Sequence, residues 1–317
     1  METVTSRPEA GLVSQPSRRG RSSASRRRAI RGAVAFLLPF LVPFTLFYVI
    51  PIGYAGYQSL LKIERPGGIF GKPVTTFAGL SQFSRVLGDS AFRSSLLRVL
   101  LFGVVQVPIM LGLALVLALL LDSTLARFKP FFRITFFVPY GIPGVLAALM
   151  WAFLYQPSLS PIIDLLDKFG LAPDFLGPNL ILWSIANVVT WTYAGYNMLI
   201  IYSALQAIPA DLYEAARLDG ASNVQIAWTI KIPIVRPAII LTAVFSVIGT
   251  LQLFTEPQVF KSISTNVTST YTPNLDAFTQ ASANNYNFAA AMSVVLAIGT
   301  FILSFVFLRF TQRRAQS

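Results

Sequence analysis

Six long runs of apolar residues divide the chain, and polar or charged segments separate them. A helix needs about 20 residues to cross the ~30 Å hydrocarbon layer of a membrane, and each run is about that long or longer. None of the runs alternates strictly between apolar and polar residues, as a barrel strand would. The pattern predicts an all-α membrane protein with six transmembrane helices, at about 33–57, 95–121, 131–155, 180–203, 237–256 and 288–308.

Composition supports this pattern and excludes most enzymes. Apolar residues make up 54% of the 317 residues and charged residues 12%, against about 25% charged in an ordinary soluble protein. The chain has no cysteine and no histidine, which removes disulfides, thiol nucleophiles, Ser–His triads and the usual zinc sites. We therefore expect no catalytic site, no metal site and no cofactor on this chain.

The net charge of +12 indicates membrane topology rather than nucleic-acid binding. Segments 1–32, 122–133, 207–236 and the tail from Arg309 hold 17 of the 25 Lys and Arg residues but only 6 of the 13 Asp and Glu residues. The positive-inside rule therefore places both termini in the cytoplasm. We expect a disordered basic arm at 1–32, a transmembrane domain at 33–310 and a cytoplasmic tail at 311–317. A cleaved signal peptide would also start with basic residues, but its apolar region spans only about 7–15 residues.

The longest predicted inner loop, 207–236, has the signals of two short helices. Pro209 suits the first turn of the first helix, where its missing N–H is not needed. Gly220 supplies the left-handed residue that ends this helix. Ser222 and Gln225 form a capping box that starts the second helix, and Pro233 is expected to end it.

Within this loop, Glu214-Ala-Ala, Gly220 four residues on, and Ile232-Pro233 beyond it resemble the EAA loop of binding-protein-dependent ABC importer permeases. The wider string 208–222 is similar to the form found in carbohydrate-uptake members. Phe77–Phe83 resembles their outer-loop motif, and Phe288–Ser293 resembles the start of their last span. The resemblance covers about residues 33–310 and implies the type I importer permease fold.

The resemblance implies a transport subunit rather than an enzyme, in a bacterial cell membrane. The loop would act as a coupling helix that docks on a dimer of cytoplasmic ATPase subunits, which bind ATP and magnesium. A second permease, identical or homologous, would complete the path, and an extracytoplasmic binding protein would deliver a sugar. The implied coupling residues are Tyr213, Glu214, Ala215, Ala216, Asp219 and Gly220.

Polar residues inside an apolar run are costly, so they tend to face a cavity or another helix. In the fourth run, such residues recur every three or four positions and share one helical face beside Trp191. In the fifth run, two more lie four residues apart near the outer end. The candidate substrate path consists of Asn187, Thr190, Trp191, Tyr193, Asn197, Gln252 and Glu256. The alternative is that these side chains only bond one helix to another, beside an aromatic belt.

Two other functions fit the chain less well. The same architecture would carry a polyol phosphate if outer-side cations such as Arg98 contacted the anion. An ion-coupled secondary transporter would need buried carboxylates in mid-span, and no run has Asp or Glu near its centre.

Overall fold

The computed structural model describes residues 23–67, 71–124, 126–171 and 173–313. The chain divides into two compact units, Met1–Tyr54 and Ala55–Ser317. In the first unit, α1 (Ser23–Phe44) continues through the π-helical turn η1 (Thr45–Val49) into α2 (Ile50–Gln58), which extends past the unit boundary at Tyr54. Residues 23–32 are therefore helical, which corrects the prediction of a disordered arm there. The rest of the predicted arm, residues 1–22, lies outside the described residues.

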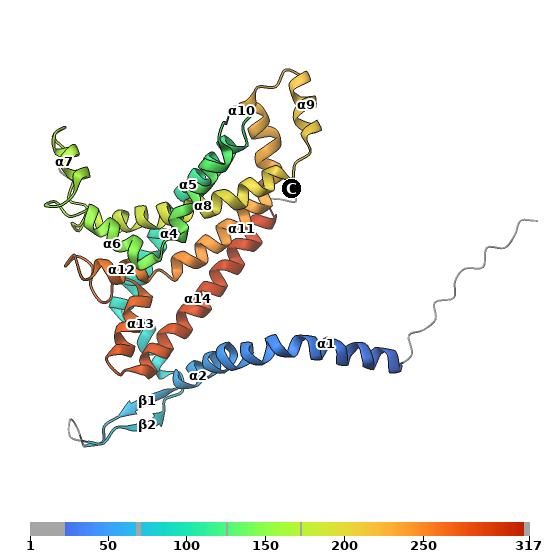
Figure 1. The fold of residues 1–317 in the computed structure, drawn as a ribbon. Helices are drawn as coiled ribbons and strands as arrows, with labels where there is room; N and C mark the ends of the chain where they lie inside the picture. The colour runs from blue at the N-terminus through green and yellow to red at the C-terminus, as the bar shows by residue number, and fades with distance from the viewer. Residues whose placement is uncertain (1–22, 68–70, 125, 172, 314–317) are drawn as a thin grey trace, which may run out of the picture. The chain divides into compact units, whose positions relative to one another are not determined.

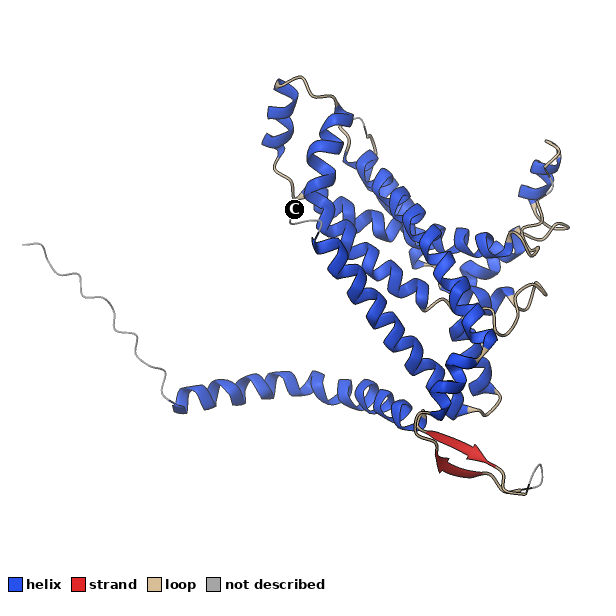
Figure 2. Cartoon of the chain, turned by 180° about the vertical axis from the view of Figure 1, so that it is seen from behind, coloured by secondary structure: helices blue, strands red, loops and turns tan. Residues whose placement is uncertain are grey.

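The second unit is mostly helical, as Figures 1 and 2 show. Its helical elements are α3 (Ser81–Gly88), α4 (Ser90–Asp122), α5 (Lys129–Gly141), α6 (Gly144–Leu154), α7 (Pro161–Asp167), α8 (Ile181–Gln206), α9 (Ala210–Leu218), α10 (Asn223–Ile226), the π-helical turn η3 (Ala227–Lys231), α11 (Ile232–Leu251), α12 (Thr255–Phe260), α13 (Pro273–Ser282) and α14 (Tyr286–Arg313). Within this unit, α9 and α10 lie at one end of the long helices and α12 and α13 at the other (Figure 1).

A small β-hairpin corrects the all-α prediction. Strands β1 (Leu61–Glu64) and β2 (Val74–Phe77) pair antiparallel, with Leu61 opposite Phe77. The buried side chain of Gln82 donates a hydrogen bond to the Leu61 carbonyl at 3.2 Å, which ties the hairpin to α3. Both strands are short and lie outside the apolar runs, so the membrane pattern carries no signal for them.

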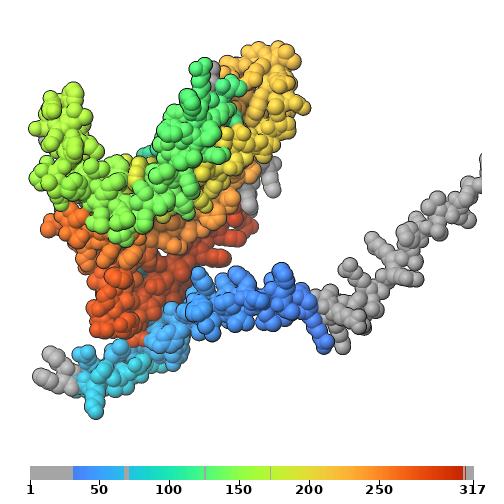
Figure 3. Space-filling model, in the orientation of Figure 1, coloured from blue at the N-terminus to red at the C-terminus, as the bar shows by residue number. Residues whose placement is uncertain are grey.

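Four described helical segments are long and apolar enough to cross a membrane: Arg31–Gln58, Ser90–Asp122, Asn223–Phe260 and Tyr286–Arg309. The predicted third span is broken, because α5 and α6 meet at an angle of 96°. The break falls at Pro143, which lacks the N–H that a continuous helix would use there. Figure 3 shows the surface hollowed between α5 and α7, with α6 along the floor.

The predicted fourth span corresponds to α8, which is 26 residues long. It is not among the described segments that pass as spans by length and hydropathy, because amides and hydroxyls interrupt its apolar sequence. Instead, α8 packs against α4, α5, α6 and α11, and much of it is buried. It is therefore an interior helix of the second unit.

A glycine permits the closest of these helix contacts. A Cβ atom on Gly195 of α8 would lie 1.7 Å from the backbone carbonyl oxygen of Phe136 in α5. Small residues let membrane helices bring their backbones this close. The observed spacing of α5 and α8 therefore requires glycine at position 195.

The predicted fifth span begins earlier and ends earlier than its apolar run. Helical structure continues from Asn223 through η3 and α11 to Leu251, so the prediction that Pro233 ends a helix is wrong. The N–H of Ile232 donates to the Ala227 carbonyl, five residues back, and Pro233 follows where this wide bonding returns to α-helical bonding. The missing N–H therefore costs the helix little. At its other end, the chain leaves the helix after Leu251, and α12 begins only at Thr255.

Candidate functional site

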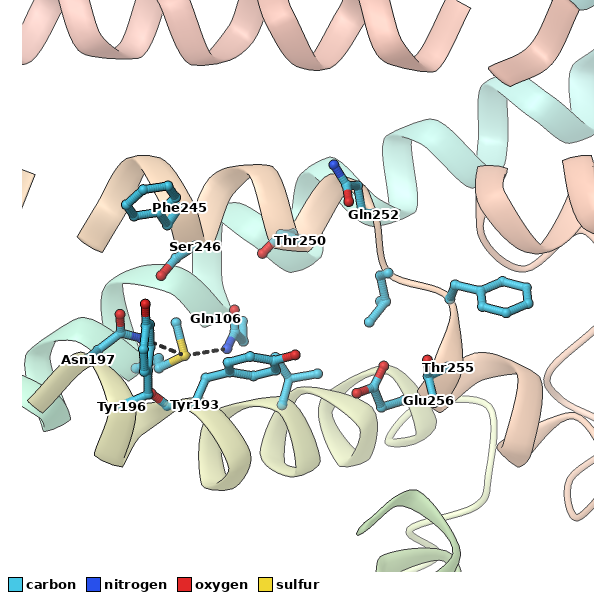
Figure 4. A pocket seen from close by; sticks show the side chains of 15 residues that line it. Gln106, Tyr193, Tyr196, Asn197, Phe245, Ser246, Thr250, Gln252, Thr255 and Glu256 are labelled. Carbon is cyan, nitrogen blue, oxygen red and sulfur yellow. Dashed lines mark hydrogen bonds between the residues drawn. The ribbon is translucent and has the colours of Figure 1, made fainter. Parts of the chain in front are cut away.

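A polar pocket of about 220 Å³ lies between α4, α8, α11 and α12 (Figure 4). The helix break at 252–254 shapes one end of it, because the chain turns there and brings Gln252 and Glu256 to the lining. Tyr196 and Asn197 of α8 and Ser246 of α11 line it further along (Figure 4). The lining combines amides, hydroxyls and aromatic rings.

Gln106 of α4 lines this pocket and has an unpaired acceptor. Its side chain is 2% exposed, and its Nε2 donates to Thr190 Oγ1 at 3.2 Å and to Met110 Sδ at 3.4 Å. Its Oε1 is buried and has no hydrogen-bond partner among the described residues. Leaving such an acceptor unpaired costs about 1–3 kcal/mol.

Asn197 of α8 is held beside Gln106. Its Nδ2 donates to the Tyr193 carbonyl at 3.1 Å and contacts Met110 Sδ at 3.7 Å. Tyr193 is 40% exposed and also lines the pocket. The pocket therefore offers an aromatic surface next to fixed amides.

Among the described residues that line the pocket, one side chain is acidic. Glu256 is 8% exposed and lines the pocket at the end near α12 (Figure 4). Among the described lining residues there is no lysine or arginine. Arg98, the candidate anion contact, lies elsewhere: its Nη1 donates to the Tyr271 carbonyl at 2.7 Å, and its guanidinium lies 4.5 Å from the centre of the Tyr271 ring.

The structure divides the predicted substrate path. Tyr193, Asn197, Gln252 and Glu256 line the pocket, whereas three other candidates bond neighbouring helices together. Asn187 donates a hydrogen bond to the Tyr155 hydroxyl at 2.8 Å, and Thr190 accepts one from Gln106. Trp191 packs edge-on against Trp151, with 5.8 Å between the ring centres.

The prediction did not include several other polar lining residues: Gln106, Tyr196, Ser246, Thr250 and Thr255. Two sequence signals were available for them. Gln106 is an isolated amide in the middle of an apolar run, and Ser246 and Thr250 lie four residues apart on one face of α11.

The 207–236 segment has the predicted local geometry. Gly220 has a φ of +82°, and its N–H donates to the Arg217 carbonyl while Ala221 N–H donates to the Ala216 carbonyl. The capping box is present: Ser222 N–H donates to Gln225 Oε1 at 2.7 Å, and Gln225 N–H donates to Ser222 Oγ at 3.3 Å. Pro209 precedes α9 rather than lying in its first turn.

The candidate coupling residues fall on two sides of α9. Glu214, Ala215, Asp219 and Gly220 are exposed, Ala216 is half-buried, and Tyr213 turns toward the body of the unit. Burial raises the pKa of the Tyr213 phenol, and the nearby Asp122 carboxylate raises it further, so the phenol keeps its proton. The exposed side presents the Glu214 carboxylate beside the small side chain of Ala215.

Residues 86–316 match the family described as binding-protein-dependent transport system inner membrane component, which covers more than half of the chain. The chain belongs to this family. The predicted resemblance to ABC importer permeases is confirmed, and the permease is a multi-pass membrane protein.

Relatives along nearly the whole permease support the match. Over 284 residues it is 30% identical to the sn-glycerol-3-phosphate transport system permease protein UgpA of Agrobacterium fabrum, which covers 87% of this chain and 93% of that protein. Over 298 residues it is 31% identical to the lactose transport system permease protein LacF of Rhizobium radiobacter, which covers 90% of this chain and 95% of that protein.

Solved structures share the fold of the permease. A chain of the bacterial alginate ABC transporter, crystallised in complex with an alginate pentasaccharide-bound periplasmic protein, superimposes with a TM-score of 0.78 at 18% identity. The alignment covers 93% of this chain and 99% of that chain. The fold is therefore that of an ABC importer permease.

Proposed function

We propose that this permease forms half of the translocation path for an uncharged sugar or oligosaccharide in an ATP-driven importer. The observation that carries the proposal is the chemistry of the pocket between α4, α8, α11 and α12. Its amides and the Glu256 carboxylate suit hydroxyl groups, and the faces of Tyr193 and Tyr196 suit the apolar side of a sugar ring. The lactose permease relative supports a saccharide as the solute.

The pocket favours an uncharged solute over a polyol phosphate. The UgpA relative is named for sn-glycerol-3-phosphate, which is an anion. In this permease, a phosphate group in the pocket would lie near the Glu256 carboxylate without a compensating cation among the described lining residues. An unpaired phosphate charge in the pocket would strongly disfavour binding of the anionic solute.

Other subunits would complete the importer. Six spans with both termini in the cytoplasm fit the distribution of basic residues, with α8 as an interior span. The exposed side of α9 would dock on an ATPase dimer, where ATP and magnesium bind. A second permease, identical or homologous, would supply the other half of the path. An extracytoplasmic binding protein would deliver the sugar to the end of the path that faces away from the ATPase dimer.

The pocket proposal predicts a difference between two polar residues of α8. In proteoliposomes that contain the complete importer, Tyr193→Ala should lower sugar uptake at least tenfold, because the ring and hydroxyl that face the solute are lost. Tyr193→Phe should cause a smaller loss, since one hydrogen bond contributes about 1 kcal/mol. Uptake of a radiolabelled panel of neutral sugars and of glycerol phosphate measures both effects.

The matched control is Asn187→Ala, on the same helix but bonded to Tyr155 rather than lining the pocket. It should transport at close to the wild-type rate. Equal uptake by Tyr193→Ala and Asn187→Ala, or a preference for glycerol phosphate over every neutral sugar, would contradict the proposed pocket.

The proposed topology can be tested with single cysteines, because the natural chain has none. In right-side-out membrane vesicles, a membrane-impermeant maleimide should label Lys261→Cys, which lies just after α12. It should label Val224→Cys only after permeabilisation, since Val224 is exposed on the 207–236 segment. Labelling of Val224→Cys in sealed vesicles would overturn the orientation.

A further inference from the structure

One carboxylate at the end of α4 holds three parts of the permease together. Asp122 is the last residue of α4, and its Oδ2 forms an ion pair with Lys231 Nζ in η3. Its Oδ1 accepts a hydrogen bond of 2.6 Å from Gln206 Nε2, at the end of α8. The Asp122 side chain is 7% exposed and that of Lys231 15% exposed, so water competes little for either charge.

Lys231 extends this connection to α9. Its Nζ lies 4.9 Å from the centre of the Tyr213 ring, within the range of a cation–π contact. Tyr213 and Ile208 belong to the apolar cluster that includes Ala118 and Leu121 of α4. Lys231 therefore connects α9 to Asp122, and Asp122 connects η3 to α4 and α8.

Chain connectivity makes this contact important. The 207–236 segment follows α8 at one end and includes the start of α11 at the other, but no covalent link leads directly from it to α4. Yet α4 carries Gln106 and Met110, which line the polar pocket. A movement of α9 therefore needs a non-covalent connection to reach the α4 side of the pocket.

We propose that Asp122 is a positioning residue that transmits movement of the 207–236 segment to α4 and α8. This inference rests on the proposed importer function and deepens it. A buried ion pair adds little net stability compared with apolar packing, but removing one partner leaves a charge buried alone. The pair thus forms a joint that favours one relative placement of η3 and α4. The two elements would therefore move together when the 207–236 segment moves.

A distance measurement tests the joint without relying on transport. Spin labels on Leu120→Cys of α4 and Val224→Cys of the segment, both exposed, report the relative placement of the two elements in the assembled complex. Wild-type and Lys231→Arg backgrounds should give one narrow distance distribution, while Lys231→Met should at least double its width. Equal widths in Lys231→Arg and Lys231→Met would overturn the proposal.

A coupling measurement tests the functional consequence. In proteoliposomes with the complete importer and its binding protein, Asp122→Asn and Lys231→Met should keep unstimulated ATP hydrolysis but lower solute uptake per ATP at least tenfold. The exchanged pair, Asp122→Lys with Lys231→Asp, should recover at least a third of the wild-type ratio. Normal uptake per ATP in both single variants would overturn the proposal.

Two controls make the result specific. Lys62→Met breaks the exposed Lys62–Glu64 ion pair of β1, 2.6 Å in length, and should leave uptake per ATP unchanged. If the wild-type complex transports no sugar while Lys231→Met still broadens the distance distribution, the proposed function fails and the joint stands. The two failures are therefore distinguishable.

Discussion

Replacing Gly195 with alanine is expected to force α8 away from α5 and to deplete the membrane of assembled permease. The added Cβ would lie 1.7 Å from the Phe136 carbonyl oxygen and 2.5 Å from its carbonyl carbon. Because these are backbone atoms, no side-chain rotation relieves the clash. Overpacking of this kind costs about 1–3 kcal/mol where side chains can adjust, and we expect at least the upper end here. Size-exclusion chromatography of the detergent-solubilised complex and its thermal unfolding temperature measure the effect.

Gly299 in α14 provides the matched control. A Cβ atom there would meet nothing within 4 Å, and the residue is helical. Gly299→Ala should keep or slightly raise the unfolding temperature, since alanine is favoured over glycine in a helix by about 0.5–1 kcal/mol. If Gly195→Ala matches Gly299→Ala in yield and unfolding temperature, the close contact of α5 and α8 does not exist in the membrane.

Replacing Gly220 with valine is expected to abolish uptake while leaving the permease inserted and folded. The φ of +82° strains a β-branched residue by at least about 1–2 kcal/mol, although a Cβ atom would meet nothing within 4 Å. The cost therefore falls on the end of α9, which should unravel and lose its docking surface. We expect uptake to fall at least tenfold and ATP hydrolysis to stop responding to the loaded binding protein.

Gly170 separates backbone strain from loss of coupling. It has a φ of +74° and also has open space around it, but it follows α7, far along the chain from the 207–236 segment. Gly170→Val should carry the same strain yet keep uptake, and Gly220→Asn should recover part of the activity because asparagine tolerates the left-handed region. Stimulated hydrolysis and normal uptake in Gly220→Val would mean that α9 is not the coupling element.

Local signals predicted the 207–236 segment well, because caps act over three or four residues. The positive φ of Gly220 and the capping box of Ser222 and Gln225 are both present. Pro233 misled the prediction, since a π turn in front of it changes the bonding register and no propensity scale reports such a turn. The hairpin of β1 and β2 was not predicted for a different reason: strand pairing depends on contacts between the two strands rather than on hydropathy.

The pocket was only half predictable because its walls come from four elements. The sequence pattern predicts one polar face on α8, but each step of three residues rotates back by about 60° at 3.6 residues per turn. Tyr193 therefore lies about 120° around the helix from Asn187, so one faces the pocket and the other faces Tyr155. The helix break that brings in Glu256 lies between Leu251 and Thr255, where the predicted apolar run continued to residue 256.

The continuous helix from Asn223 to Leu251 also acts as a lever. At 1.5 Å per residue it is about 43 Å long, so a tilt of only about 5° at the 207–236 segment would displace its other end by about 4 Å. That end carries Thr250 and leads directly into Gln252, both of which line the pocket. A small rotation at the Asn223 end would thus displace the pocket residues by about the size of a side chain. Any bend of the helix at η3 would reduce this displacement.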